Sequence, residues 1–220
     1  MKQTIATLLL ITTAIAGFSQ KKISVTEEQN TLSVGSVNTL TVTVYGMSYD
    51  DAEKAWKKQL KDINGDVKVK KEVFADDCLI KDMSENTFDV YAMLKEVDNG
   101  VKVIAAYDLG GAYLSAASHK EYFAKISKMM YDFGVEQTKE AIGSDIKVAE
   151  DDLKASEKAK EDLEKDIKKL EKDIEDYKQK IEDSKKAIED NKSGIETKKT
   201  EIESKKEVIK ALENKRDAVN

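Results

Sequence analysis

The first half of the chain contains short runs in which apolar and polar residues alternate. Residues 39–45 and 87–94 alternate with a period of two, and residues 101–107 form a further run that is rich in apolar residues. Runs of this kind are typical of strands that bury one face. The sequence Asp-Asn-Gly at residues 98–100 separates the last two runs and predicts a hairpin turn. Shorter runs between residues 67 and 80 predict additional strands.

Two segments have the period of an amphipathic helix instead. Ser48 is suited to cap a helix whose first turn is acidic, and a second helix is expected to begin near residue 118. The apolar positions of the first helix share one face, as do those of the second. The first set is Ala52, Trp56, Leu60 and Ile63, and the second is Tyr122, Phe123, Ile126, Met129, Met130 and Phe133. Residues 21–37 are polar and predict either an edge strand or a flexible lead-in.

The order of these elements is β-α-β-β-β-α, and it predicts an α+β globular domain over residues 20–143. We expect a small, mostly antiparallel sheet with one or two helices packed on it. A long C-terminal α-helical coiled coil is expected to follow over residues 144–220. Charged residues make up 36% of the chain and it contains no proline, so nothing in its composition interrupts a long solvated helix.

A seven-residue repeat is the strongest pattern in the chain. Isoleucines recur at heptad position a, and position d between them is half apolar, as in a coiled-coil seam. The predicted seam consists of Ile167, Leu170, Ile174, Ile181, Ile188, Ile195, Ile202, Ile209 and Leu212. The only candidate turn is residues 191–194, Asn-Lys-Ser-Gly, so a hairpin there is the alternative. Because the heptad frame passes through Gly194 without slipping, the sequence favours a continuous helix.

The charges at heptad position e change sign along the coil. This position holds Glu150, Glu157, Glu164 and Glu171, and then Lys178, Lys185, Lys192, Lys199 and Lys206. In an antiparallel pair position e faces position e, so Glu171 meets Lys178 and Glu164 meets Lys185. In a parallel pair Asp166 meets Glu171 and repels it. The coil is therefore expected to bind protein, as a homodimer whose favoured orientation is antiparallel or with another envelope protein as partner.

The N-terminal residues predict export. Lys2 precedes an apolar stretch over residues 5–16, followed by small residues, which is typical of a secretory signal peptide over residues 1–19. Cleavage after Ser19 is favoured over cleavage after Ala16, and an uncleaved N-terminal anchor is the alternative. No later segment is apolar enough to span a bilayer. The expected location is periplasmic or secreted. The net charge of −6 argues against a nucleic-acid partner.

Candidate chemistry is sparse. His119 is the only histidine and Cys78 is the only cysteine, so neither a multi-histidine metal site nor an intramolecular disulfide is expected. Cys78 is expected to be a small buried apolar residue. We predict no catalytic residues, no metal site and no cofactor. Gly110 and Gly111, in the segment 108–114, are the candidate ligand-binding residues, but a β-bulge or a tight strand-to-helix crossing is the favoured explanation of the two glycines.

Three functions remain open from the sequence. The favoured one is an exported, non-enzymatic structural or adaptor protein, in which a coiled coil dimerises or spaces a small α+β domain. The second is a periplasmic module that binds a small ligand near residues 108–114. The third is an enzyme of unknown class, for which Cys78 and His119 are the only distinctive candidates as nucleophile and base.

Overall fold

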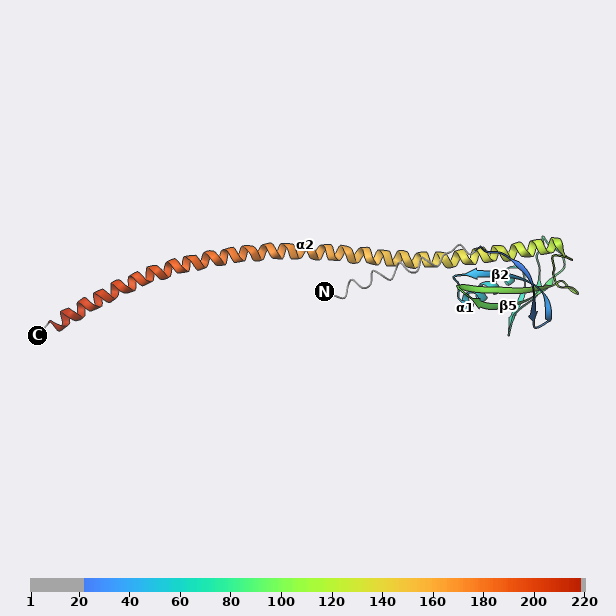
Figure 1. Ribbon diagram of the computed structural model, residues 1–220, viewed down its shortest axis with the longest axis horizontal. Helices are drawn as coiled ribbons and strands as arrows, with labels where there is room; N and C mark the ends of the chain where they lie inside the picture. Colours follow the sequence, from blue (N-terminus) through green and yellow to red (C-terminus); the bar gives the residue numbers. More distant parts are fainter. Residues whose placement is uncertain (1–21, 219–220) are drawn as a thin grey trace. The chain divides into compact units, whose positions relative to one another are not determined.

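The computed structural model describes residues 22–218, and its contacts divide the chain into two units, Met1–Ala149 and Glu150–Asn220. The predicted signal peptide at residues 1–19 lies outside the described residues. The elements, several of which Figure 1 labels, are β1 (Thr26–Leu32), β2 (Gly35–Tyr45), α1 (Tyr49–Asp62), β3 (Asp66–Val69), β4 (Val73–Cys78), β5 (Phe88–Val97), β6 (Gly100–Asp108) and α2 (Lys120–Asp217).

The first unit is built on a six-stranded sheet of order β1-β2-β6-β5-β4-β3, in which every neighbouring pair is antiparallel. This confirms the α+β fold with an antiparallel sheet. Residues 21–37 contribute the edge strand β1, and Gly35 (φ +106°) begins β2 four residues before the predicted strand. The β5–β6 turn at Asp98 and Asn99 lies where the sequence predicts it, with Asn99 in the left-handed region.

Helix α1 forms as its sequence predicts. The Ser48 hydroxyl accepts a hydrogen bond from the Asp51 N–H at 3.2 Å, which satisfies one of the unpaired donors of the first turn. Ala52, Trp56 and Leu60 are fully buried. The helix ends before Asn64, which adopts a left-handed conformation and turns the chain toward β3.

Both helices pack on the same face of the sheet. The main core cluster joins Trp56 and Leu60 of α1 to Ile126, Met130 and Phe133 of α2 and to alternate residues of the strands. The rings of Trp56 and Phe133 meet edge to face, with centroids 5.1 Å apart. Edge-to-face contact is the favoured geometry for two aromatic rings and adds to the stabilisation from apolar burial.

A smaller apolar cluster lies on the opposite face of the sheet. It contains Leu32, Val37 and Ala106, with Tyr91 and Met93 packed against them. Nearby, the N–H and hydroxyl of Ser33 donate to the two carboxylate oxygens of Glu72 at 2.8 and 2.7 Å. Ser33 lies in the β1–β2 turn and Glu72 in the β3–β4 turn, at opposite edges of the sheet. The sheet therefore curls strongly enough for its two edge hairpins to meet.

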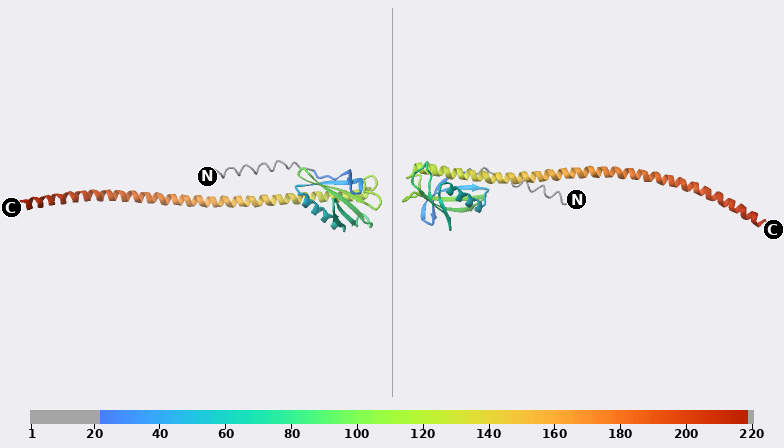
Figure 2. Two further views of the ribbon diagram at one scale, coloured as in Figure 1. Left: turned by 90° about the horizontal axis from the view of Figure 1, so that it is seen from below. Right: turned by 180° about the vertical axis from the view of Figure 1, so that it is seen from behind.

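Helix α2 differs in extent from the separate elements that the sequence predicts. It begins at Lys120, close to the expected start of the second helix, and continues without interruption for 98 residues. The second helix and the C-terminal coil are therefore one helix. Figure 2 shows from two further sides that its ribbon, from yellow-green to red, is unbroken. The absence of proline and the tolerance of a helix for isolated glycines explain the continuity.

Gly134 allows α2 to lie close against β2. A Cβ atom at this position would be 2.6 Å from a methyl carbon of Val42 and 3.1 Å from one of Ile23. Gly143 lies nine residues further along the same helix, where a Cβ atom would meet nothing within 4 Å. The two glycines thus have the same helical conformation but opposite steric surroundings.

We therefore expect opposite effects when each is replaced by alanine. Gly134→Ala forces the stiff Val42 side chain to move, and overpacking of this kind costs about 1–3 kcal/mol, more than the roughly 1 kcal/mol that alanine contributes as a better helix former. Gly143→Ala should raise the free energy of unfolding by about 0.5–1 kcal/mol. Urea unfolding of both variants measures the difference. Equal stabilisation by both would contradict the close packing of α2 on β2.

Candidate interaction surface and other candidate sites

The predicted seam lies on α2 within the second unit, and all of its members are exposed. Its seven isoleucines expose between 52 and 56% of their surface, and Leu170 and Leu212 expose about the same share. Residues 150–217 extend for about 100 Å at the rise of an α-helix. Exposure of an isoleucine at every seventh residue from Ile167 to Ile209 is unfavourable in water, and recurring apolar surfaces of this kind mark sites of interaction.

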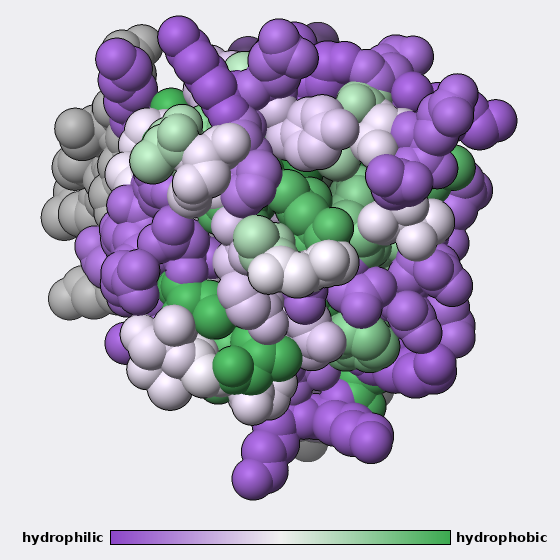
Figure 3. Space-filling model, turned by 90° about the vertical axis from the view of Figure 1, so that its right-hand side faces the viewer, coloured by the Kyte–Doolittle hydropathy of each residue, from purple (hydrophilic) through white to green (hydrophobic). Residues whose placement is uncertain are grey.

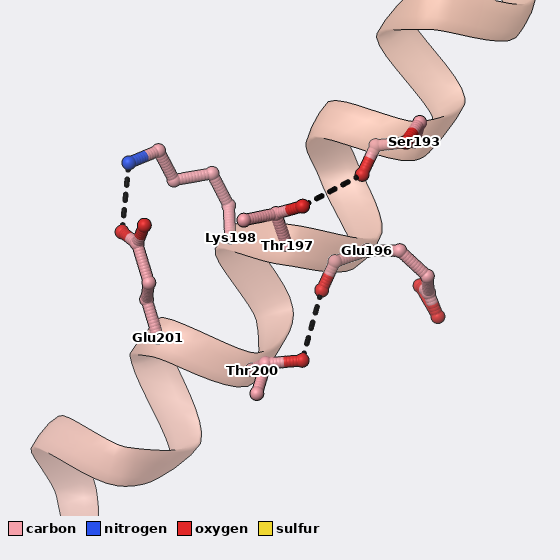
Figure 4. A network of polar contacts seen from close by, with 6 residues as sticks. All are labelled: Ser193, Glu196, Thr197, Lys198, Thr200 and Glu201. Atoms are coloured by element: carbon pink, nitrogen blue, oxygen red, sulfur yellow. Dashed lines mark hydrogen bonds and ion pairs between the residues drawn. The ribbon is translucent and has the colours of Figure 1, made fainter.

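The helix is intact at residues 191–194, so the structure has no hairpin there. Figure 4 shows the helix from Ser193 onward, where the hydroxyls of Thr197 and Thr200 donate to the carbonyls of Ser193 and Glu196, four residues earlier, at 3.1 and 3.2 Å. Lys198 pairs with Glu201 at 2.7 Å. Gly194 needs no special conformation and has open space where a side chain would be. Among the described residues of the second unit, 150–218, there is consequently no second element for the seam to contact.

Four of the five lysines at position e form ion pairs with glutamates three residues earlier. Lys178, Lys185, Lys199 and Lys206 pair with Glu175, Glu182, Glu196 and Glu203 at 3.5, 2.7, 3.0 and 3.4 Å. All four pairs are solvent-exposed, so each contributes little to stability. A carboxylate from another helix is free to replace these glutamates at little cost.

One hollow interrupts the seam. Ser184 occupies a d position between Ile181 and Ile188, and its small side chain leaves an open hollow of about 510 Å³ on the helix surface. Tyr177, Lys180 and Lys185 complete its lining. In coiled coils a side chain of one helix inserts between four residues of the facing helix. Ile181, Ser184, Lys185 and Ile188 have the spacing of such a set of four residues.

Gly110 and Gly111 form a tight turn after β6. Their N–H groups face one carboxylate oxygen of Asp108 at 3.0 and 3.4 Å, and the Leu109 N–H donates to the Ala112 carbonyl. Both glycines are exposed, have φ values of +84° and +132°, and would meet nothing within 4 Å if they carried a Cβ atom. Their conformation accounts for glycine at both positions. Ligand binding there stays a prediction.

A larger groove in the first unit lies elsewhere, between α1 and residues 133–145 of α2. It has a volume of about 740 Å³, with lysines on the α1 side and acidic residues on the α2 side. The charged lining consists of Asp51, Lys54, Lys57, Lys58, Lys61, Asp62, Glu136, Glu140 and Asp145. Sequence reasoning missed this groove because nothing in a single sequence pairs α1 with that part of α2.

Cys78 is buried in the core, and His119 makes a local backbone hydrogen bond at the start of α2. Cys78 is fully buried, as predicted, and burial raises the pKa of its thiol to about 12, so it is protonated at neutral pH. The ring nitrogen Nδ1 of His119 accepts a hydrogen bond from the Ser115 N–H at 3.3 Å, just before α2 begins. Among residues 22–218, no group of three or more histidine, cysteine or acidic side chains is arranged to hold a metal ion.

The face of the molecule shown in Figure 3 has apolar side chains (green) only in patches broken by hydrophilic residues. This distribution is ordinary for a protein surface. It contrasts with the seam, where exposed isoleucines recur without a break from Ile167 to Ile209. The seam is therefore the surface that is most distinctly suited to bind a partner.

The comparisons with known proteins do not assign the chain to a class. It matches no protein-family model, and it has no significant similarity to a curated protein or to a solved structure. In the part of the chain that the structure describes, no helix combines the length and the apolar character needed to cross a membrane.

An acidic group at the ends of β4, β5 and β6 makes stability depend on pH. Burial raises the pKa of the Asp89 carboxyl, and the charges of Asp76 and Asp108 raise it further, while the Asp77 N–H, which donates to Asp89 at 3.3 Å, opposes them. Because the folded state binds this proton more tightly than the unfolded state does, ionisation of Asp89 destabilises the fold. This destabilisation develops as the pH rises from the pKa of Asp89 in the unfolded state to its higher pKa in the folded state, and is complete above the latter.

We expect Asp89→Asn to stabilise the protein by a few tenths of a kcal/mol at pH 7, since the site is partly solvated. Asparagine keeps an oxygen that can accept from Asp77. The gain should vanish at pH values below the pKa of Asp89 in the unfolded state, where the wild-type carboxyl is neutral in both the folded and the unfolded protein. Thermal unfolding of wild type and variant between pH 3 and 7 measures it, with Asp82→Asn on the exposed loop after β4 as the matched control. A gain that does not change with pH would contradict the charge effect.

Proposed function

We propose that the protein is an exported, non-enzymatic structural or adaptor protein whose coiled-coil helix joins its α+β unit to a second helix, with a second copy of the chain as the favoured partner. The observation that carries this proposal is the exposure of every seam isoleucine along an unbroken helix. A helix of this length with no tertiary partner gains its stability from pairing. The alternative partner is another protein of the cell envelope.

Pairing through the seam makes a concentration-dependent dimer the expected state. The double variant Ile174→Ser/Ile181→Ser removes four apolar side chains from a dimer and should weaken association by about ten-thousandfold or more, given roughly 1.5–3 kcal/mol per buried isoleucine and about 1.4 kcal/mol per factor of ten. Sedimentation equilibrium of the purified protein measures the dissociation constant.

The matched control is Gln179→Ser/Lys186→Ser, which introduces the same residue on neighbouring turns at heptad position f, away from the seam. This variant should dimerise like the wild type. A wild-type chain that stays monomeric at every concentration would refute self-association and leave the envelope protein as the partner to be sought.

Export is the part of the proposal that rests on the N-terminal sequence alone. When the gene is expressed in a host with a secretory pathway, we expect the mature chain to begin at Gln20, after cleavage at Ser19. Intact-mass measurement of the protein recovered from the periplasm or medium identifies its first residue. Recovery of a full-length chain from the cytoplasm would overturn the proposed location.

A further inference from the structure

We infer that the seam binds a second copy antiparallel and in a single register, with the twofold axis between Glu171 and Lys178. This inference rests on the proposed self-association and goes beyond it by specifying which residues meet. Three features of the second unit agree with this register: the charges beside the seam, the hollow at Ser184, and Lys160, the charged residue at the a position that precedes the seam.

The charges beside the seam are complementary in this register. With the axis placed between Glu171 and Lys178, the position-e residues of the two copies meet as four pairs of opposite sign, each of which occurs twice in the dimer. The pairs are Glu171 with Lys178, Glu164 with Lys185, Glu157 with Lys192, and Glu150 with Lys199. On the other side of the seam Asp173 meets Lys180, which is attractive, and Asp152 meets Glu201, which is not.

Neighbouring antiparallel registers and the parallel orientation bring like charges together. A shift of one heptad in either direction brings Glu171 against Glu171, or Lys178 against Lys178, at the twofold axis. A parallel dimer brings Lys180 against Lys185 and Asp166 against Glu171. Like charges that face each other on paired helices are unfavourable, so the favoured arrangement is the one without such a contact at its centre.

The hollow at Ser184 fits the same register. In an antiparallel coil each a residue packs against a d residue of its partner, and this register places Ile167 of the second copy over Ser184. The open hollow between Tyr177 and Ile188 is where that isoleucine would insert. At the centre, Ile174 faces Tyr177 of the second copy. Large side chains thus meet small or flat ones, which allows the two helices to pack closely.

The polar residues of the seam also meet. Lys160 is the only charged residue at position a between Leu153 and Ile209, and this register places it opposite Asn191 of the second copy. The Asn191 side-chain oxygen can accept a hydrogen bond from the Lys160 ammonium group. A shift of one heptad toward the C-terminus would place Lys160 opposite Lys198 instead. A shift of one heptad the other way would place Lys160 opposite Ser184 and leave Asn191 against Leu153. The pairing of Lys160 with Asn191 therefore favours the proposed register over its two neighbours.

Crosslinking between two chains of different mass tests the register. Full chains carrying Glu164→Cys are mixed with full chains carrying Lys185→Cys and treated with a short bis-maleimide. We expect a heterodimeric product from this mixture and none from either variant alone. Lys178→Cys and Lys192→Cys are the matched controls, because each lies at position e but is displaced by one heptad, about 10 Å along the helix.

The native Cys78 does not interfere, since its thiol is fully buried, and the wild-type chain serves as the blank. A dominant product of Glu164→Cys with itself would establish a parallel dimer and overturn the inference. A dominant product with Lys178→Cys or Lys192→Cys would establish a different register. In each of these cases the proposed dimer would stand, whereas a wild-type monomer would refute both.

Charge reversal provides a second test, because it should weaken an antiparallel dimer and strengthen a parallel one. Lys185→Glu should weaken an antiparallel dimer about tenfold, because Glu164 then meets a glutamate on both sides of the axis. The double variant Glu164→Lys/Lys185→Glu should restore affinity to within about twofold. Lys186→Glu, the same change at the outward position f, is the control. In a parallel dimer Lys185 faces Lys180, so tighter binding of Lys185→Glu would overturn the inference.

Discussion

The packing of α2 on the sheet both completes the core of the first unit and fixes the start of the helix that carries the seam. Its first turns contribute Ile126, Met130 and Phe133 to the main core, and Gly134 allows the helix to approach β2 closely. The same helix then continues through the second unit, where it is the only element among the described residues 150–218. One element therefore completes the globular core and also presents an unpaired apolar surface. The fold of the first unit and the association of the second are linked by covalent continuity along one helix.

The local elements were predictable because their signals are local. The cap at Ser48, the buried face of α1 and the turn at Asn99 follow from residue type and period, and the structure confirms each of them. The continuous helix through Gly194 was predictable for a similar reason, since a heptad that keeps its phase across a segment is evidence that the segment stays helical. The long helix and the antiparallel sheet thus needed no information beyond short-range pattern.

Features that depend on distant residues were not predictable. The Ser33–Glu72 hydrogen bonds join turns 39 residues apart in sequence, and the groove beside α1 is completed by residues more than seventy positions further along the chain. The sharp turn at Gly110 and Gly111 could be foreseen as an unusual backbone, but a glycine pair does not distinguish a ligand site from a turn. The continuity of the predicted second helix with the coil was missed because the two segments have different apolar faces. The first face is buried in the core of the first unit, and the second is the exposed seam.

The sign change along position e bears on the identity of the partner as well as on the orientation of the two helices. A coil that binds a different protein needs charges complementary to that protein, and nothing requires its own edge to be complementary to itself. Here position e holds glutamates up to Glu171 and lysines from Lys178 onward. When a second copy lies antiparallel, with the twofold axis between these two residues, each glutamate therefore faces a lysine. The Ser184 hollow and the Lys160–Asn191 layer fall in the register that this point defines. Agreement among charge, shape and polarity in one self-pairing register favours a second copy of the chain over an unrelated helix as the partner.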